Sequence, residues 1–463
     1  MNFKTTIGLE IHVQLKTKSK MFCGCNNNAE EAQPNTLVCP VCLGLPGTLP
    51  VANKQAIEWT VKTGLALNSK IAEFSKFDRK HYFYPDLPKG YQVSQFDLPF
   101  LVDGEVKIET ENGDRTIHLT RIHLEEDAGK LIHSGNDSLV DLNRAGTPLM
   151  EIVTEPEIAS PTEAKLFLQE LRSILRYLNV SDADMEKGHM RADANISLSS
   201  TNELGVPVEI KNMNSFRMIE RALSYEEKRQ VEELEAGRKI AKETRGWDDV
   251  KGETYSQRSK EFAQDYRYFP EPDLPPFEVH KMFDLDKLKT EVPELPSEKR
   301  AKYQEMGISK QDSEILALDQ DMAKYFDAVS GQVSPKLAAN WIINELKIDG
   351  LKKLEAEKLI GLIGLIEDNT ISGKIAKDVL IDMIETGKNA QKIIEEKGLK
   401  QIGDESEIEK IVDQVISENS EIVASIKAGK TAAIGFLVGQ IMKETKGQAN
   451  PGVVNKILEE KIK

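Results

Sequence analysis

Strict alternation of apolar and polar residues predicts several β-strands in the N-terminal part of the chain. Residues 7–15 place Ile, Leu, Ile, Val and Leu on one side and Gly, Glu, His and Gln on the other. Successive side chains of a strand point to opposite faces, so Glu10 and His12 share a polar face. Similar alternation recurs at 120–125, 149–154 and 191–198. We therefore predict a mostly antiparallel sheet with one apolar and one polar face.

The polar face of this sheet carries residue types that bind metals. Glu125 and Glu151 project from two of the predicted strands, and carboxylates brought together in this way can hold a hard cation or a phosphate-bound metal. Solvated carboxylates on an ordinary half-exposed sheet are the alternative. The first strand favours a site, because Glu10, His12 and Gln14 are metal and hydrogen-bond ligands, whereas a solvated face favours Lys, Thr and Ser.

Two amphipathic helices are predicted to accompany the strands. Ser160-Pro-Thr-Glu163 is a capping box with proline at the first helical position, and an apolar stripe follows it. We expect this helix to pack on the back of the sheet. A second helix begins at Phe216 and ends near Gly237. We expect its charged residues 226–229, which are Glu, Glu, Lys and Arg, to be solvated.

Helical spacing dominates from Pro293 onward and indicates an all-α region. Ser334-Pro335 and Ser372 are expected helix starts, and Gly398 is an expected helix stop. A linker near Gln401 then precedes a small helical tail. The predicted fold class is therefore α+β, with a mostly antiparallel-sheet domain over 1–292, a helical domain over 293–400 and a helical tail over 401–463.

Composition and charge restrict the partners of this chain. The 463 residues carry a net charge of -15, so a nucleic acid would have to bind at local basic patches. The sequence does not open with the pattern of a signal peptide, and its apolar runs are too short to span a membrane. We expect a cytoplasmic protein without a membrane partner.

The cysteines are confined to one short segment. Cys23 and Cys25 form a Cys-x-Cys pair, and Cys39 and Cys42 form Cys-Pro-Val-Cys. In a reducing compartment this cluster predicts a tetrahedral zinc site rather than disulfides. The first pair is tighter than the usual spacing, and free or redox-active thiols are the alternative. Thiolates that complete the coordination shell would make the zinc structural and non-catalytic.

Nucleotide chemistry has no familiar motif in this sequence. Ala428-Gly-Lys430-Thr431 looks like the end of a P-loop, but the required upstream glycine is replaced by Ala424. The nucleophile elbow of the α/β-hydrolases and a dinucleotide fingerprint do not stand out either. Residues 77–95 interleave aromatic residues with Arg79, Lys80 and Lys89, which could stack on a base and contact phosphate. A buried aromatic loop with turn prolines is the alternative.

Several stretches of the chain resemble the B subunit of the bacterial tRNA-dependent amidotransferases, which act on glutamyl-tRNA(Gln) and aspartyl-tRNA(Asn). In the sheet domain they are 8–12, 77–86, 124–130, 141–151, 191–195 and 265–273. In the helical region they are 372–377, 435–443 and 446–451, and the tail resembles the YqeY-like module of this family. The resemblance covers nearly the whole chain, and its motifs are long and specific.

This resemblance implies a cradle-shaped sheet domain with a zinc knob at 23–42. It also implies a ligase that uses ATP and Mg²⁺ to phosphorylate the side-chain carboxylate of glutamate or aspartate on a misacylated tRNA, after which ammonia displaces the phosphate. The implied catalytic residues are Glu10, His12, Glu125 and Glu151, of which His12, Glu125 and Glu151 hold Mg²⁺. The implied ammonia-channel residues are Glu126, Lys80 and Lys89.

The resemblance also implies partners. The sequence shows no amidase-type Gly-Gly-Ser-Ser stretch, so ammonia would come from an amidase-family glutaminase, the A subunit, while a small wrapping protein, the C subunit, would complete a heterotrimer. Misacylated tRNA(Gln) or tRNA(Asn) would be the substrate. In the tail, Lys427, Lys430, Lys443 and Lys446 recur at helical spacing and could contact the tRNA, although ordinary solvated lysines would look the same.

Two other functions fit parts of this sequence. A non-catalytic, zinc-containing tRNA-binding scaffold subunit would use the same surfaces without a metal at Glu125. A magnesium-dependent kinase of a small carboxylate would use the same sheet face, but the long helical tail would then have no role. Loss of ATP cleavage on mutation of His12 or Glu151 distinguishes the catalytic function from the scaffold.

Overall fold

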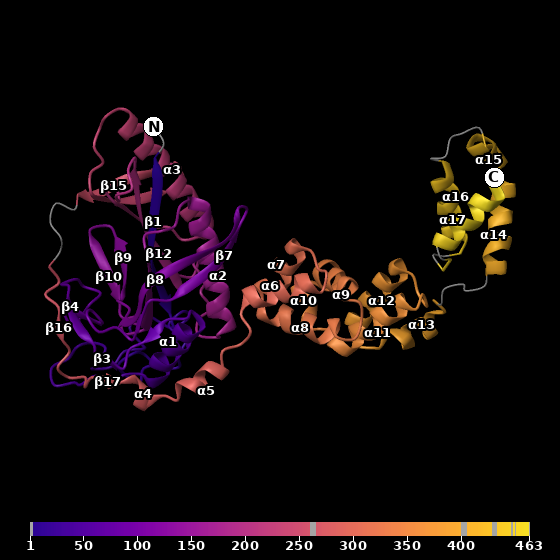
Figure 1. Cartoon of the computed structure of the whole chain (residues 1–463). Coiled ribbons are helices and arrows are strands. Elements are labelled where there is room, and N and C mark those ends of the chain that lie inside the picture. Colours follow the sequence, from indigo (N-terminus) through magenta and orange to yellow (C-terminus); the bar gives the residue numbers. More distant parts are fainter. Residues whose placement is uncertain are drawn as a thin grey trace. The chain divides into compact units, whose positions relative to one another are not determined.

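The computed structural model describes residues 3–259, 265–399, 405–427, 433–445, 448–449 and 451–462. The chain forms two compact units, Met1–Ser297 and Glu298–Lys463 (Figure 1). The first unit contains the strands and the second consists of helices, so the predicted α+β class is confirmed. The domain boundaries at 292/293 and 400/401 remain predictions.

A 10-stranded sheet forms the centre of the first unit. Its strands lie in the order β15-β14-β13-β12-β1-β11-β8-β6-β2, with β7 paired to β8. All of its pairings are antiparallel except that of β13 with β14, as the alternating pattern predicts. The strands are β1 (Lys4–Gln14), β2 (Lys70–Ile71), β6 (Leu101–Val102), β7 (Glu105–Thr110), β8 (Gly113–Glu126), β11 (Pro148–Thr154), β12 (Met190–Ser199), β13 (Val208–Lys211), β14 (Glu243–Asp248) and β15 (Glu253–Ser259).

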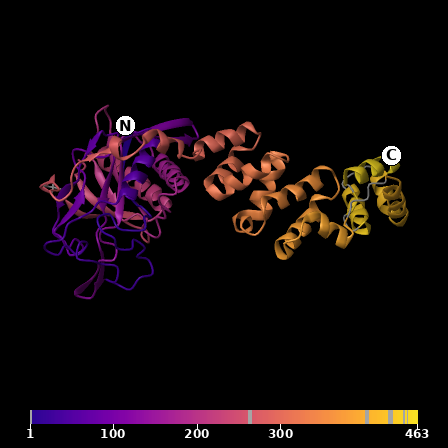
Figure 2. The same ribbon diagram turned by 90° about the horizontal axis from the view of Figure 1, so that it is seen from below.

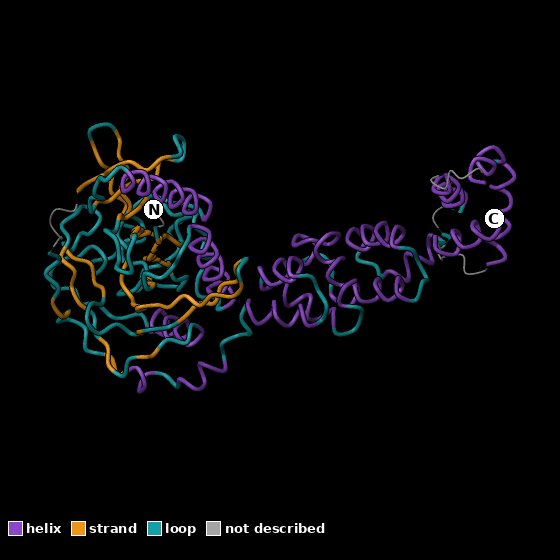
Figure 3. Tube along the Cα trace, turned by 45° about the horizontal axis from the view of Figure 1, so that its top comes forward, coloured by secondary structure: helices purple, strands orange, loops and turns teal. Residues whose placement is uncertain are grey.

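The two faces of this sheet differ as the sequence predicts. Ile7, Leu9 and Ile11 of β1 are buried in the main hydrophobic core, together with residues of α2 (Pro161–Tyr177) and α3 (Phe216–Glu235). Ser160 caps α2 by accepting a hydrogen bond from the backbone N–H of Glu163 at 3.2 Å. Figures 1 and 3 show both helices along one side of the strands. The polar residues of β1, β8 and β11 therefore face the other side, where the candidate site lies.

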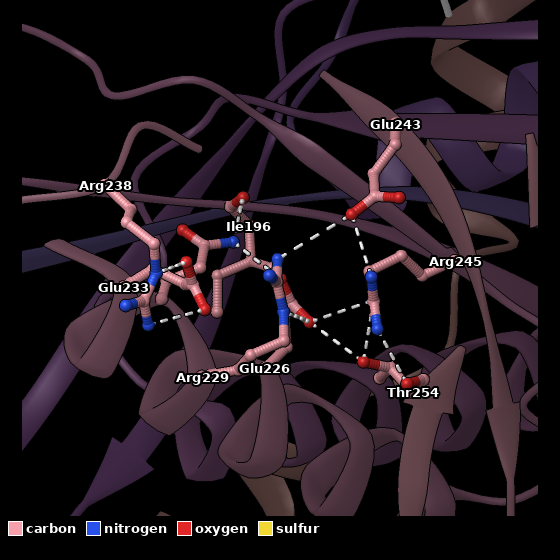
Figure 4. Close-up of polar contacts among 9 residues, drawn as sticks. Ile196, Glu226, Arg229, Glu233, Arg238, Glu243, Arg245 and Thr254 are labelled. Atoms are coloured by element: carbon pink, nitrogen blue, oxygen red, sulfur yellow. Dashed lines mark hydrogen bonds and ion pairs between the residues drawn. The ribbon is translucent and has the colours of Figure 1, made fainter. Parts of the chain in front are cut away.

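Glu226 on α3 is buried, which corrects the expectation that the charged residues of this helix are solvated. Its side chain is 0% exposed and accepts hydrogen bonds from Arg229 Nε at 2.9 Å and Thr254 Oγ1 at 3.0 Å. Arg245 Nε of β14 lies 3.4 Å from the same carboxylate (Figure 4). Helical periodicity cannot reveal this burial, because β14 and β15 cover the helix only in the folded chain. Lys228 is exposed, as expected.

Smaller elements complete the first unit. A three-stranded sheet has the order β16-β4-β5, and two-stranded pairs join β9 to β10 and β3 to β17. These strands are β3 (Phe74–Ser75), β4 (Asp78–His81), β5 (Tyr91–Ser94), β9 (Lys130–Ser134), β10 (Asp137–Asp141), β16 (Phe269–Pro270) and β17 (Phe277–Glu278). The helices are α1 (Lys54–Ala66), α4 (Val279–Met282) and α5 (Leu285–Thr290).

The second unit consists of helices (Figure 2) and contains two hydrophobic cores, one over 303–394 and one over 408–462. Pro335 is the first residue of α9, Ser372 caps α12 and Gly398 ends α13 in the left-handed conformation, which confirms three predicted helix ends. The predicted linker near Gln401 lies outside the described residues. Among the described residues, no helix is long and apolar enough to cross a membrane.

The helices around the first of these cores are α6 (Pro296–Glu305), α7 (Lys310–Leu318), α8 (Gln320–Ser330), α9 (Pro335–Asn340), the π-helix η1 (Trp341–Leu346), α10 (Lys347–Leu351), α11 (Ala356–Glu367), α12 (Gly373–Thr386) and α13 (Ala390–Lys397). Those around the second are α14 (Glu405–Glu418), α15 (Ser420–Lys427), α16 (Ile434–Glu444) and α17 (Pro451–Ile462). Each core is built from helices that are close in sequence.

Candidate active site

Three adjacent strands bring His12, Glu125 and Glu151 together. His12 of β1 is the cross-strand partner of Glu151 on β11, and Glu125 projects from β8 on the other side of β11. His12 Nε2 lies 3.3 Å from Glu151 Oε2 and 3.7 Å from Glu125 Oε1. One ligand atom from each residue lies within 4.8 Å of the others, a separation that one metal ion can bridge. The sheet thus assembles an imidazole and two carboxylates from distant parts of the sequence.

The electrostatics of this cluster show a concentrated negative charge. Burial opposes a charged ring at His12, but the hydrogen bond to Glu151 and the charges of Glu151 and Glu125 outweigh it and raise the pKa of His12 to about 9. Burial and the neighbouring Glu151 raise the pKa of Glu125. The pKa of Glu151 is lowered despite its burial, because His123 and His12 both stabilise its anion. A divalent cation would relieve the repulsion between the carboxylates.

His123 is a neighbour of this cluster: the strand alternation predicts that it shares a face with Glu125, but the sequence reasoning gave it no role in the site. Its Nε2 lies 3.3 Å from Glu151 Oε2 and 4.0 Å from Glu125 Oε2, and its side chain is buried. The alternation of β8, which places positions 123 and 125 on the same face, was the signal that could have identified it. Ser94 Oγ also donates to Glu125 Oε2 at 3.1 Å, a contact that the sequence does not reveal.

The cluster opens into a cavity of about 540 Å³. His12 and Glu125 form part of its wall, and Lys80, Tyr82 and Tyr266 line it as well. Further polar lining comes from β12, β13 and the loop after β13, through Arg191, Asp193, Lys211, Asn212 and Asn214. A cavity with aromatic rings, cations and a potential metal site has the groups needed to bind a phosphorylated nucleotide.

Glu10 lies beside the cluster and outside the group of atoms that could share one ion. It pairs across the sheet with Asp193, and Asn195 Nδ2 donates to its Oε1 at 3.1 Å. Burial raises the pKa of Glu10, and the charges of Glu151 and other nearby carboxylates raise it further. The structure therefore places Glu10 on the predicted face, two residues along β1 from His12.

Asp127 is a second residue that sequence reasoning missed. It lines the cavity, and its Oδ2 accepts hydrogen bonds from Arg191 Nη2 and Gln14 Nε2, each at 2.8 Å. Burial opposes its ionisation, but Arg191 and Arg144 outweigh burial and hold the pKa of Asp127 below its ordinary value. This buried ion pair fixes Arg191 at the cavity wall.

The residues expected in an ammonia channel occupy two different positions. Lys80 lines the cavity and lies 4.9 Å from the ring centre of Tyr266. Burial opposes its charge, yet Glu125 and Glu151 raise the pKa of Lys80. Lys89 forms an ion pair with Glu126, whose carboxylate also accepts a hydrogen bond from the backbone N–H of Val93 at 2.9 Å. Glu126 therefore faces a different environment from Glu125.

Two stretches rich in aromatic and basic residues, 77–95 and 265–273, fold against each other. Strand β16 pairs with β4, and the rings of Phe96 and Tyr268 stack at 4.5 Å. Phe77 is buried in the core, as the alternative of a buried aromatic loop predicts, whereas Lys80 lines the cavity, so contact of this stretch with a base or phosphate stays a prediction. Arg79 instead forms a bidentate pair with Glu271, with distances of 2.8 and 2.7 Å, so its guanidinium is occupied within the protein.

All the cysteines come together in a second cluster. One sulfur each from Cys23, Cys25, Cys39 and Cys42 lies within 4.8 Å of the others, and none forms a disulfide. A hydrogen bond from Cys23 is the main cause that lowers the pKa of Cys42 to about 4, while the same contact raises the pKa of Cys23. Four converging sulfurs with one readily ionised thiol fit a tetrahedral thiolate metal site.

Only part of the predicted tRNA contact in the tail can be placed. Lys443 lies on α16 and is exposed. The backbone of Lys427 ends α15, but its side chain is not described. Lys430 and Lys446 lie outside the described residues.

The chain is similar to known proteins over its whole length. Residues 5–284 match the model of the GatB/GatE catalytic domain, and residues 324–462 match that of the GatB domain. Proteins from Caldanaerobacter subterraneus and Persephonella marina, both named as the B subunit of aspartyl/glutamyl-tRNA(Asn/Gln) amidotransferase, are 51% and 49% identical and are aligned over 100% of each chain. A protein of the same name from Thermotoga maritima is 48% identical over 99% of each chain.

The fold and these matches define a component of a tRNA-dependent amidotransferase, a ligase of protein biosynthesis. The chain belongs to the family formed by the B subunits of the aspartyl/glutamyl-tRNA(Asn/Gln) amidotransferases. As a member of this family, it works with other amidotransferase subunits and with tRNA. The sequence resemblance is thereby confirmed over the full length of the chain.

Proposed function

We propose that the cavity at His12, Glu125 and Glu151 activates the side-chain carboxylate of glutamate or aspartate on misacylated tRNA(Gln) or tRNA(Asn). A carboxylate oxygen of the substrate attacks the γ-phosphorus of ATP, and ADP leaves. The nitrogen of ammonia then attacks the acyl carbon, and phosphate leaves to give the amide of Gln-tRNA(Gln) or Asn-tRNA(Asn). The observation that carries this proposal is the convergence of three metal-ligand side chains, two of which, His12 and Glu125, line a polar cavity.

The residues present fit Mg²⁺. Hard carboxylate oxygens suit this ion, and Glu125 and Glu151 present theirs in the same space as His12 Nε2. When bound, Mg²⁺ neutralises charge on the transferred phosphoryl group. His123 and Ser94 hold the two carboxylates in place through the contacts described above. Glu10 lies beside them on the polar face of β1 and accepts a hydrogen bond from Asn195.

Cationic side chains in the cavity suit the polyanionic substrates. Lys80 carries its charge near Glu125 and Tyr266, and it is placed to contact a phosphate within the cavity. Arg191 is fixed by Asp127 and forms another part of the wall. The ring of Tyr266 offers a face on which a base can stack. These contacts would hold the nucleotide and the aminoacyl end close together before phosphoryl transfer.

We further propose that Glu126, Lys89 and Lys80 lie along the path of ammonia. A protected path is required because ammonia in water becomes ammonium, which is not nucleophilic. Glu126 is the last residue of β8, its ion pair with Lys89 is largely buried, and the preceding residue, Glu125, lines the cavity. The ammonia would come from the A subunit, an amidase-family glutaminase, which would assemble with this chain and with the small C subunit.

The cysteine cluster would have a structural role, and the tail lysines would bind the tRNA substrate. The cluster would hold a structural Zn²⁺, because four sulfurs complete a tetrahedral shell. Lys427, Lys430, Lys443 and Lys446 would contact the tRNA through its phosphates. The acidic net charge of -15 makes such a local basic patch necessary. A cytoplasmic location suits both the thiolate cluster and the tRNA substrate.

Mutation of the proposed metal ligands tests this function. In the assembled complex with Glu-tRNA(Gln), His12→Ala or Glu151→Ala should reduce ATP cleavage to background while glutaminase activity survives. His118→Ala is a matched control, because His118 lies on β8 but is 57% exposed and pairs with Glu157 away from the cavity. Unchanged ATP cleavage in both ligand variants would favour the non-catalytic scaffold instead.

A further inference from the structure

Lys20 is a buried lysine that the proposed chemistry does not use. It follows β1 in the chain, and its side chain is 0% exposed. Removing an ammonium from water costs several kcal/mol unless the interior provides a counter-charge and hydrogen-bond acceptors. The groups around Lys20 Nζ should therefore reveal why a lysine is buried at this position.

One sulfur and one carbonyl oxygen contact this ammonium. Lys20 Nζ lies 3.8 Å from Cys42 Sγ and 3.4 Å from the carbonyl oxygen of Leu142. In the described part of the chain, no Asp or Glu forms an ion pair with Lys20. A neutral thiol is a weak acceptor, whereas a thiolate is an anion that can compensate a buried cation. The burial of Lys20 is thus explained if Cys42 is a thiolate.

The negatively charged cysteine cluster in turn needs a nearby positive charge. Four thiolates around one divalent cation carry a net charge of about -2, and the share of that charge on a buried sulfur is costly unless a cation compensates it. Cys42 is the buried member of the cluster and is the one that Lys20 contacts. One ammonium against its sulfur would offset about half of this negative charge.

We propose that Lys20 is the buried counter-cation of the cysteine cluster, and that its ammonium stabilises the metal-bound state by donating to Cys42 Sγ. This inference rests on the proposal that the cluster holds zinc, and it is independent of the chemistry at His12, Glu125 and Glu151. Lys20 acts on the metal through Cys42, so it is a positioning residue. Residues that donate to metal ligands commonly change metal affinity about 10–100-fold when they are replaced.

The backbone around Lys20 holds it in this position. The backbone N–H of Lys20 donates to the carbonyl of Cys25 at 3.0 Å, and that of Met21 donates to the carbonyl of Gly146 at 2.7 Å. Gly146 has a φ of +85°, and a Cβ at this position would lie 3.6 Å from Lys20 Cδ and 3.7 Å from Cys42 Cβ. The side chain is therefore enclosed between the cluster and the turn before β11, and it has no route to solvent.

Zinc affinity tests the proposal directly. We would purify the full chain in its complex, measure bound zinc by mass spectrometry and measure its affinity by competition with a chromogenic chelator. Lys20→Met should weaken zinc binding about 10–100-fold. Lys20→Arg retains the positive charge and should lose less. Lys18→Met is the matched control, because Lys18 is exposed and should leave the affinity unchanged.

A double-variant comparison separates electrostatics from packing. Cys25→His replaces a thiolate by a neutral ligand, so it should cost less zinc affinity in the Lys20→Met background than in the wild type. An equal loss of zinc affinity from Cys25→His in both backgrounds would overturn the proposal. Wild-type zinc affinity in Lys20→Met would also overturn it, as would equal losses of zinc affinity in Lys20→Met and Lys20→Arg. Lys20→Gln gives the same comparison if circular dichroism shows that the Met variant is unfolded. ATP cleavage by the wild-type complex separately tests the proposed function.

Discussion

His12 and Glu151 are direct cross-strand partners on β1 and β11, and 3.3 Å separates His12 Nε2 from Glu151 Oε2. The antiparallel register of two central strands sets this distance, so backbone hydrogen bonds determine where the ring meets the carboxylate. Glu125 joins the pair from β8, the other neighbour of β11. A site built on three adjacent strands is rigid, and rigidity suits chemistry that depends on preorganised charges.

Removing the charge of Lys89 should uncouple ammonia delivery from ATP cleavage. Lys89→Met leaves Glu126 without its ion-pair partner. A hydrogen bond to a charged group contributes about 1.5–3 kcal/mol, so glutamine-dependent amidation should fall by about tenfold or more. Amidation with added ammonium salt and ATP cleavage should both be retained. Parallel assays with glutamine and with ammonium as donor measure the difference.

The exposed residue Lys107 on β7 provides a control for the loss of one charge. Lys107→Met should leave amidation unchanged with glutamine and with ammonium as donor. Equal losses with glutamine and with ammonium in Lys89→Met would contradict a role of this ion pair on the ammonia path, because a local distortion of the active site would affect both donors.

Truncating Glu226 should destabilise the first unit strongly. Glu226→Ala removes the carboxylate that compensates Arg229 and Arg245 and leaves their guanidinium groups without it (Figure 4). Breaking a buried ion pair by removing one partner typically costs about 3–5 kcal/mol of unfolding free energy. Urea unfolding measures this change. The exposed Glu232 on the same helix is the control, and Glu232→Ala should have little effect. Similar stability in both variants would show that the buried network contributes little.

Replacement of Glu243 should give a stability loss that depends on pH. Burial opposes ionisation, but hydrogen bonds from Ser256 and Arg245 outweigh it and lower the pKa of Glu243 below its ordinary value of 4.5. A depressed folded-state pKa contributes stability that is present above the unfolded pKa and is lost as the pH falls through the folded pKa. Glu243→Gln should therefore be less stable than the wild type at pH 7, by no more than about 1 kcal/mol.

The difference between wild type and Glu243→Gln should shrink below the ordinary pKa of 4.5 and vanish at lower pH. Denaturant unfolding at a series of pH values measures this difference. A constant difference across that range would mean that the hydrogen bonds of Glu243, rather than its charge, stabilise β14.

Loss of the tail lysines should weaken tRNA binding and its dependence on salt. Replacing Lys427, Lys430, Lys443 and Lys446 together by Ala removes contacts with phosphates, and each lost contact lowers the salt slope by roughly one. Filter binding over a range of salt concentrations measures both quantities. A control with equal charge change uses exposed lysines elsewhere in the second unit, at Lys352, Lys353, Lys374 and Lys392. Unchanged affinity and slope in the tail variant would exclude this binding surface.

Several features of the site could be predicted from the order of residues alone. Alternation at 7–15 and 120–125 placed His12 and Glu125 on polar strand faces, because the period of two is a local property of a strand. The spacing of the cysteines predicted one cluster for a similar reason. The capping box at Ser160 predicted a helix start, because a cap needs only its own first turn.

Other features depended on how the strands and helices pack. Alternation could not show that β11 lies between β1 and β8, since register and strand order are set by contacts between distant segments. The ion pairs of Asp127 and of Glu226 were equally hidden, because both acids look like surface residues until another strand brings arginines over them. Sequence therefore determined which residues face the same way along each strand. Only the tertiary structure decided which of those faces meet, because long-range pairing, rather than local periodicity, sets the distances between charges.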